Sequence, residues 1–203
     1  MADRAGEQTA AVVLAAGESS RLGRPKSLLP FGESTVIGCV VGAMEGAGVH
    51  PILVVAGAAA PEIQAALART RAQVLLNPAP ERGMVSSLRI SVGALPDKVG
   101  RFLIALGDQP RLKASDVTRL LDEQARLGKG IAIASYRGKR GHPVVFTSRY
   151  REEILTLRDD QILRDLIHSH ADDVTVVECE SDGVIHDIDT QEDYERELGR
   201  TNP

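Results

Sequence analysis

The chain has 203 residues, a hydrophobic share of 43%, a charged share of 26% and a net charge of −4. This length supports one substantial core, and the composition excludes a disordered or collagen-like chain. A negative charge argues against a nucleic-acid-binding or membrane-binding surface, which needs an excess of Lys and Arg. We therefore expect a single domain over residues 1–203, with its core at about 10–198 and neither nucleic acid nor membrane as a partner.

The compartment can be predicted from the apolar runs and the cysteines. No apolar run approaches the roughly 20 residues of a membrane span, and the polar N-terminus lacks the apolar core of a signal peptide. Cys39 and Cys179 lie far apart and form no CxxC pair, so we expect two reduced core residues and no zinc site or disulfide. The protein is predicted to be cytoplasmic.

Apolar runs alternate with amphipathic stretches along most of the chain, which is typical of βα units on a mainly parallel sheet. Strands are predicted at 10–16, 51–56, 73–76, 102–106, 131–135, 144–146 and 174–179. Helices are predicted at 35–45, 61–69, 85–94, 115–126, 151–157, 161–169 and 191–198. Several strands are continuously apolar, as expected when helices cover both faces. The predicted fold is a three-layer α/β/α sandwich of Rossmann-like type.

Local signals refine this pattern. Ser115 is predicted to cap its helix, and Gly128 is predicted to take a left-handed conformation after it. Residues 137–143 interrupt the alternation as a hairpin or inserted flap. The cations of this hairpin are Arg137, Lys139 and Arg140. They suit a small anionic ligand, with solvated loop charge as the alternative.

The strand at 10–16 opens into a loop, residues 17–26, that is rich in Gly, Ser and cations. Successive backbone N–H groups in such a loop can bind phosphate oxygens, while Arg21, Arg24 and Lys26 add positive charge. An ordinary βα turn is the alternative. Three better-known loops do not fit: the Walker A, dinucleotide and nucleophile-elbow spacings are all broken. We predict a phosphate-binding loop of another kind.

A second candidate site follows the strand at 102–106, where Asp108 stands in a turn. Ligands of open α/β sheets bind at the carboxyl ends of strands, so Asp108 and Gly17 are expected at one edge. Mg²⁺ commonly takes one or two protein carboxylates plus substrate phosphates. The candidate partners are Asp187 and Asp189, which alternate with Ile188 and so point to one side. The alternatives are a structural turn at Asp108 and helix capping by Asp189 or Thr190.

A third segment, residues 77–89, is a loop that runs into a helix carrying hydroxyl groups in its first turn. Gly83, Ser86 and Ser87 could read a nucleobase or ribose through free N–H groups and hydroxyls, and helix capping is the alternative. His142 in the hairpin is a weaker candidate, since a lone histidine there is more often a solvated surface residue.

These motifs resemble those of the MobA-like NTP transferases, within the glycosyltransferase-A-like nucleotidyltransferase fold. The similar segments are residues 14–26, 83–89, 107–110, 141–143 and 187–190, in the same order along the chain. The branch that the chain resembles most is the molybdenum cofactor cytidylyltransferases. The guanylyltransferase branch usually reads Ala-Gly-Gly in the first loop, whereas this chain has Ala15-Ala16-Gly17.

The resemblance implies Mg²⁺ as cofactor and transfer of CMP from CTP to the molybdenum cofactor molybdopterin, with release of pyrophosphate. It implies catalytic roles for Arg21, Lys26 and Asp108, and metal binding by Asp108 with Asp189 or Asp187. The implied nucleotide-binding residues are Leu14, Ala15, Ala16, Gly17, Ser19, Ser20, Arg21, Lys26, Gly83, Ser86, Ser87 and Asp108. Gln109, Pro110 and His142 would lie on the acceptor side. A recipient molybdoenzyme is the implied protein partner.

Three other functions remain open from the sequence. The chain could transfer CMP or UMP to a sugar or alditol phosphate, transfer GMP to molybdopterin, or act as a non-catalytic molybdoenzyme maturation factor. A phosphate acceptor is already a nucleophile, so the transfer needs alignment and charge stabilisation and no general base. This agrees with the absence of a convincing His or Glu beside the loop.

Overall fold

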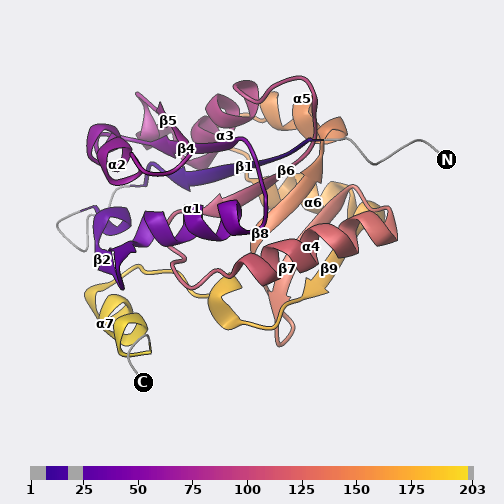
Figure 1. Cartoon of the computed structure of the whole chain (residues 1–203). Coiled ribbons are helices and arrows are strands. Elements are labelled where there is room, and N and C mark those ends of the chain that lie inside the picture. The colour runs from indigo at the N-terminus through magenta and orange to yellow at the C-terminus, as the bar shows by residue number, and fades with distance from the viewer. Residues whose placement is uncertain (1–7, 18–24, 201–203) are drawn as a thin grey trace.

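The computed structural model describes residues 8–17 and 25–200, and a seven-stranded sheet forms the centre of this part of the chain (Figure 1). Its strands are β1 (Gln8–Ala15), β4 (Ile52–Ala56), β5 (Gln73–Leu76), β6 (Val99–Leu106), β7 (Ile131–Tyr136), β8 (Lys139–Thr147) and β9 (Val174–Glu178). Their order in space is β5-β4-β1-β6-β8-β7-β9, and β8 is antiparallel to both neighbours while the other pairings are parallel. A short antiparallel ribbon is formed by β2 (Pro30–Phe31) and β3 (Ser34–Thr35).

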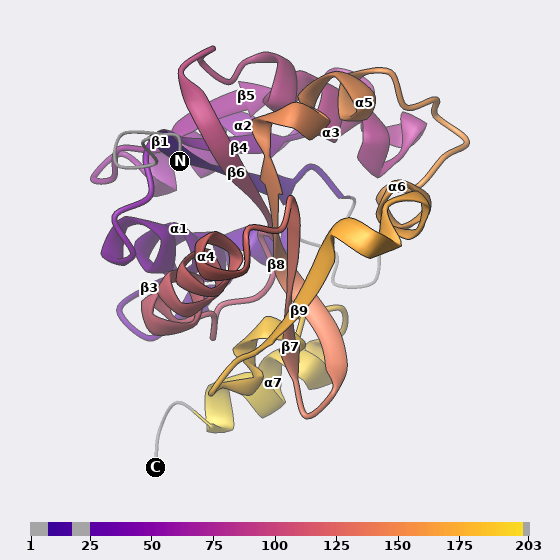
Figure 2. The ribbon, with the colours of Figure 1, turned by 90° about the vertical axis from the view of Figure 1, so that its right-hand side faces the viewer.

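Helices cover both faces of this sheet. They are α1 (Val36–Gly46), α2 (Ala60–Ala66), α3 (Met84–Gly93), α4 (Ala114–Leu127), α5 (Arg151–Leu155), α6 (Leu163–Ser169) and α7 (Gln191–Gly199). One hydrophobic cluster joins α1, α2 and α4 to one face, and a second joins α3, α5 and α6 to the other (Figure 2). The predicted three-layer sandwich is confirmed.

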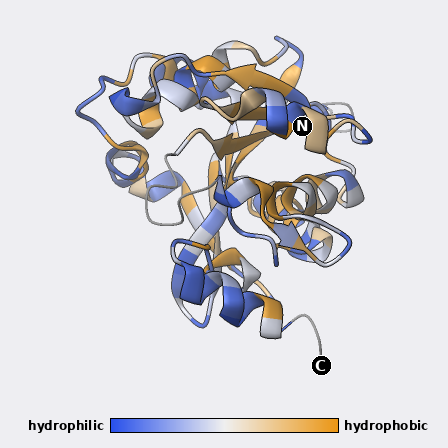
Figure 3. Cartoon of the chain, turned by 90° about the vertical axis from the view of Figure 1, so that its left-hand side faces the viewer, coloured by the Kyte–Doolittle hydropathy of each residue, from blue (hydrophilic) through white to orange (hydrophobic). Residues whose placement is uncertain are grey.

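The continuously apolar strands make this arrangement possible because alternate side chains enter opposite cores. In β1, Ala11 and Val13 belong to the first cluster, whereas Ala10 and Val12 belong to the second. Hydrophobic residues accordingly concentrate on the central strands, and much of the outer helical surface is hydrophilic (Figure 3). Helix α7 packs separately, where Ile188 and Tyr194 meet Phe31 in a small third cluster.

The topology brings the ends of two strands together. The chain leaves β1 toward β4, while β6 lies on the other side of β1, so the strand order reverses between β1 and β6. Leu14 of β1 stands beside Leu106 of β6, and the N–H of Gly107 donates to the carbonyl of Leu14 at 2.9 Å. A side chain at Gly107 would be crowded here, because its Cβ would lie 2.9 Å from Cδ1 of Ile37 and 3.0 Å from Cβ of Ala15. Ligand sites form at such reversal points.

The seven predicted helices and seven predicted strands are all found among the described residues, with shifts at their ends. The largest is in β8, predicted at 144–146, which already begins at Lys139 and so includes most of the predicted segment 137–143. Gly128 is left-handed at φ +67°, as predicted, and the hairpin turns through Arg137 and Gly138, both at positive φ. The cap prediction for Ser115 is wrong. Helix α4 already begins at Ala114, so Ser115 lies inside its first turn.

Two further findings concern the thiols and the helices. Cys179 is buried, Cys39 is partly buried, and both are free. Among the described helices, none is long and apolar enough to cross a membrane.

Candidate nucleotide and metal site

A cavity of about 810 Å³ opens at the carboxyl ends of β1, β4 and β6. It is lined by Leu14, Ala15, Ala16, Gly17, Pro25, Lys26, Ser27, Gly57, Ala58, Ala59, Pro80, Gly83, Met84, Ser87, Leu106, Gly107, Asp108 and Asp187. Its volume is in the range of small-molecule sites, which is about 300–1,000 Å³. The predicted loops after β1, before α3 and after β6 therefore share one cavity.

Three carboxylates meet at one end of this cavity. Asp108, Asp187 and Asp189 each offer an oxygen, and these oxygens lie within 4.8 Å of one another. The ammonium of Lys26, in the short 3₁₀ helix η1 (Lys26–Leu28), lies 2.5 Å from Oδ2 of Asp108 and 2.9 Å from Oδ1 of Asp189. The predicted acidic cluster is therefore present, with a cation already between two of its members.

Burial and neighbouring charge set the protonation of these groups. Burial raises the pKa of Asp108, and although Lys26 opposes this, the nearby acids reinforce it. Burial alone would lower the pKa of Lys26, but Asp108 and Asp189 outweigh it and raise that pKa. Lys26 is therefore a permanent cation at neutral pH. Its charge stabilises a carboxylate that burial would otherwise disfavour.

The cluster fits a hard divalent cation. Oδ1 of Asp108 is buried and has no hydrogen-bond partner among the described residues. A buried carboxylate oxygen without a donor is costly, and coordination of a cation removes that cost. Oxygen ligands from carboxylates are what Mg²⁺ and similar ions prefer. The Lys26 ammonium stands in for such a cation beside the same carboxylate.

Ser87, which lines the cavity, belongs to a small polar group with Ser86 and Asn77 that we call the serine shelf. Asn77 follows β5 and is only 2% exposed. Its Nδ2 donates to the hydroxyls of Ser86 and Ser87 at 2.8 and 2.9 Å, and its Oδ1 accepts from the N–H of Ala79. The Ser86 hydroxyl also donates to the carbonyl of Gly83 at 2.8 Å. Ser87 faces the cavity, whereas Ser86 is buried beside it. Helix α3 begins after Gly83 without a side-chain cap, so the capping alternative is wrong.

Residues 11–174 match the family model of the MobA-like NTP transferase domain. The chain belongs to this family. Nicotine blue oxidoreductase from Paenarthrobacter nicotinovorans is 32% identical over 196 residues, which cover 92% of this chain and 95% of that protein. The predicted family is thus confirmed, and with it the nucleotidyltransferase class of the domain.

Solved structures agree with this assignment. Rv0371c from Mycobacterium tuberculosis H37Rv superposes with a TM-score of 0.84 at 30% identity, over 96% of this chain and 99% of that one. A nucleotidyl transferase from Methanothermobacter thermautotroptrophicus gives 0.82 at 29% identity, over 97% and 100%. A second structure of Rv0371c is a complex with manganese, so that protein binds a divalent metal. That structure gives 0.78 at 30% identity, over 96% and 99% of the two chains.

Within this MobA-like domain, two of the predicted acceptor residues, Gln109 and Pro110, are buried and do not line the cavity. Gln109 is only 3% exposed, and its Nε2 lies 3.5 Å from the carbonyl of Val184 in η5 (Asp182–Val184). Pro110 is buried too, and neither residue lines the cavity. The packing of η5 against this turn therefore gives Gln109 a structural environment that the sequence motif did not reveal.

His142 is partly buried, so it is not the solvated surface residue of the alternative prediction. Burial lowers its pKa, against the opposing charge of Asp187. The imidazole is therefore neutral at physiological pH and lies within electrostatic reach of the acidic cluster. Arg137, Lys139 and Arg140 are exposed on the hairpin and do not line the cavity, in agreement with solvated charge.

Two groups of residues could not be compared directly: predicted residues that the structure does not describe, and lining residues that the motifs did not name. Ser19, Ser20, Arg21 and Arg24 fall outside the described residues, so their predicted roles stay predictions. The motifs missed the wall formed by Gly57, Ala58 and Ala59 after β4, and Met84, inside the similar segment 83–89, was not named as a site residue. The small residues directly after a buried strand were the available signal. Asn77 was missed in its organising role, although a polar side chain directly after β5 pointed to it.

Proposed function

We propose that this MobA-like domain transfers CMP from CTP to molybdopterin, forming the cytosine dinucleotide and pyrophosphate. The observation that carries the transfer is the meeting of Lys26, Asp108 and Asp187 in a cavity of nucleotide size. The choice of molybdopterin rests on the sequence resemblance. Mg²⁺ is the proposed cofactor, the cytoplasm the proposed compartment, a single domain over residues 1–203 the proposed organisation, and a molybdoenzyme the proposed recipient.

The proposed roles follow the lining of the cavity. The backbone from Leu14 to Gly17 and the charges of Lys26 and Arg21 bind the triphosphate, and Ser87 lies toward the base. Asp108 holds the metal together with Asp189 or Asp187, whose oxygens all lie within 4.8 Å. When bound, Mg²⁺ supplies charge neutralisation at the phosphates. His142 is the proposed acceptor-side residue.

The reaction needs little covalent chemistry from the protein. A phosphate oxygen of the acceptor forms a bond to the α-phosphorus, the bond from that phosphorus to the bridging oxygen breaks, and pyrophosphate leaves with the electron pair. The Gly17 loop and Lys26 align the triphosphate and balance its developing charge, which is where the rate comes from. A phosphate monoester is a sufficient nucleophile, so no side chain has to remove a proton.

The preference for CTP rests on Ala15 and Ala16. Both line the cavity, and the methyl group of Ala16 stands where guanylyltransferase relatives carry an extra glycine. Less room for a purine follows. A site that pairs its polar groups with one base also rejects another base that leaves them unpaired.

Competition tests this proposal. Equal CTP and GTP are supplied with Mg²⁺ and molybdopterin, and the dinucleotide formed is identified together with pyrophosphate. We expect cytosine product. Predominantly guanine product would overturn the base preference, and turnover of sugar or alditol phosphates alone would give the chain the alternative acceptor. Binding of molybdopterin without pyrophosphate release from any nucleotide would indicate a maturation factor.

A second candidate is suggested by one relative. Nicotine blue oxidoreductase is similar to this chain over 92% of its length, and a nucleotide-binding cavity also suits a dinucleotide electron donor. Hydride transfer makes no use of the three clustered carboxylates, which favours nucleotidyl transfer. The two candidate functions are distinguished by incubating the chain with nicotine blue and a reduced nicotinamide nucleotide and measuring the loss of the visible absorbance of nicotine blue. Bleaching without pyrophosphate chemistry would favour the oxidoreductase.

A further inference from the structure

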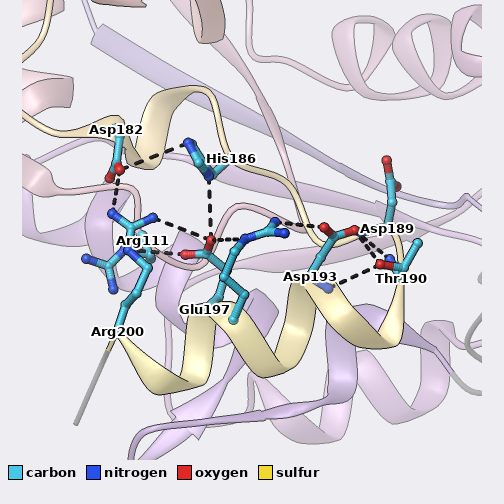
Figure 4. Close-up of polar contacts among 9 residues, drawn as sticks. Arg111, Asp182, His186, Asp189, Thr190, Asp193, Glu197 and Arg200 are labelled. Carbon is cyan, nitrogen blue, oxygen red and sulfur yellow. Dashed lines mark hydrogen bonds and ion pairs between the residues drawn. The ribbon is translucent and has the colours of Figure 1, made fainter. Parts of the chain in front are cut away.

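We propose that Asp193 and Glu197 of α7 are positioning residues for the metal-binding carboxylates. The inference rests on the metal site of the proposed function and deepens it. The two acids are four residues apart and so share one face of the helix. Figure 4 shows both side chains directed toward the segment 186–190, which carries Asp187 and Asp189.

Asp193 fixes the C-terminal end of that segment. Its Oδ2 accepts from the N–H of Asp189 at 3.2 Å, from the N–H of Thr190 at 2.9 Å and from the Thr190 hydroxyl at 2.8 Å. The Thr190 hydroxyl in turn accepts from the N–H of Asp193 at 3.1 Å, which completes a capping box. The side chain of Asp189 is 52% exposed, so its direction is set by its ion pair with Lys26 at 2.9 Å and by the backbone that Asp193 holds.

Glu197 fixes the other end. Its carboxylate is 1% exposed and lies 3.5 Å from Nδ1 of His186, the residue before Asp187. It also lies 3.5 Å from the guanidinium of Arg111, in the loop that follows Asp108 (Figure 4). Arg196 and Arg200 surround the same carboxylate at 3.6 and 3.5 Å. One buried acid thus connects the segment that follows Asp108 to the segment that carries Asp187 and Asp189.

The segment between these anchors is joined to the rest of the site. The N–H of Ile188 donates to the carbonyl of Asp108 at 3.0 Å, and the Ile188 side chain is fully buried. The hydroxyl of Tyr194 donates to the carbonyl of Pro30 at 2.6 Å, which ties α7 to the strand after η1 and so to Lys26. Helix α7 therefore joins the Lys26, Asp108 and Asp187 segments into one unit.

The chemical reason for such a unit lies in the mutual repulsion of the ligands. Asp187 and Asp189 carry like charge beside Asp108, so without anchors these two exposed side chains would move away from the cavity. Partners that orient metal ligands typically account for 10- to 100-fold in metal affinity or activity. Capping by Asp193 thus acts on the metal site as well as on the helix.

The test measures Mn²⁺ binding to the purified chain by the loss of the free-ion electron paramagnetic resonance signal. We expect Asp193→Ala to raise the Mn²⁺ Kd by about 10-fold or more. Asp193→Asn, which keeps an acceptor oxygen, should fall between Asp193→Ala and the parent. Glu197→Gln should also weaken binding, provided that its circular dichroism shows a native fold.

Asp165→Ala is the matched control, because Asp165 lies at the same helix position in α6 and accepts from the N–H of Ile162 at 3.4 Å. Helix α6 packs through Leu163, Leu166 and Ile167 in a different hydrophobic cluster from that of α7. We expect both alanine substitutions to lower the Tm, and only Asp193→Ala to weaken Mn²⁺ binding. Equal Mn²⁺ affinity in the two variants would overturn the positioning role.

The same measurement separates this inference from the proposed function. A parent chain that binds no Mn²⁺ would remove the metal site and the positioning role together. A parent chain that binds Mn²⁺, loses it in Asp193→Ala and still transfers no CMP would retain the positioning role and lose the proposed reaction.

Discussion

The ammonium of Lys26 lies 2.5 Å from Oδ2 of Asp108, although the two residues follow different strands of the sheet. The pairing arises because β1 and β6 are neighbours whose carboxyl ends meet. It joins the phosphate-binding loop to the acidic cluster. The first two predictions separate the roles of these two side chains.

Asp108→Asn should lower the rate of pyrophosphate release by about a hundredfold or more, because a neutral amide weakens cation binding where charge develops. The amide has nearly the same volume, so circular dichroism should be unchanged. Asp97→Asn is the control, since Asp97 is fully exposed and does not line the cavity. A parent rate with unchanged Mg²⁺ dependence would remove Asp108 from the metal site.

Lys26→Ala should reduce kcat to a similar extent, on the order of a hundredfold, while Mn²⁺ binding is kept or tightened. The reason is that the ammonium competes with a metal for Asp108 and Asp189. Steady-state kinetics and Mn²⁺ titration on the same preparation check this. Simultaneous loss of metal binding would show that Lys26 supports the carboxylates instead of the triphosphate.

Asn77→Ala should raise the KM for the nucleotide about 3- to 10-fold and leave kcat within about twofold, since each lost hydrogen bond is worth roughly 1 kcal/mol. The change frees the Ser87 hydroxyl that faces the cavity. Ser91→Ala is the control, because Ser91 is buried in the same helix and bonds only to backbone carbonyls among the described residues. Matching KM values for the two variants would contradict a role of the serine shelf in nucleotide binding.

Gly141→Ala should destabilise the fold by about 1–3 kcal/mol. A Cβ at Gly141 would collide with the carbonyl oxygen of Val184 and lie 2.9 Å from the side chain of Ile185. Gly42→Ala provides the comparison: Gly42 lies in α1 with open space around it, so its helix propensity should improve stability by up to about 1 kcal/mol. Thermal unfolding of both variants checks the opposite signs.

Cys179 should react slowly with iodoacetamide at pH 8 in the native chain. Burial raises the pKa of its thiol to about 11, so the reactive thiolate forms only at strongly alkaline pH. The unfolded chain, whose thiols ionise near pH 8.5, should be labelled faster at pH 8. The raised pKa also implies a stability contribution that is present below about pH 8.5 and lost as the pH rises toward 11. Mass spectrometry of pulse-labelled protein checks the rates, and rapid native labelling would contradict the burial.

Several features could be predicted from the sequence because their causes are local. The apolar run of β1 requires cover on both faces, and its end at a glycine predicts a ligand-binding loop. Asp108 directly after a buried strand, and Asp187 and Asp189 on alternate positions, are visible as patterns. The family followed from the same motifs, and the match over residues 11–174 confirms it.

Other features were decided only by the tertiary structure, because they depend on contacts between residues distant in sequence. The antiparallel β8 between β6 and β7, the turn of Gln109 toward η5 and the cavity wall at Gly57 all depend on which elements pack together. The contacts of Asp193 and Glu197 with segment 186–190 also depend on how α7 packs. Sequence periodicity reports which face of an element is buried, whereas side-chain packing and long-range hydrogen bonds determine what that face meets.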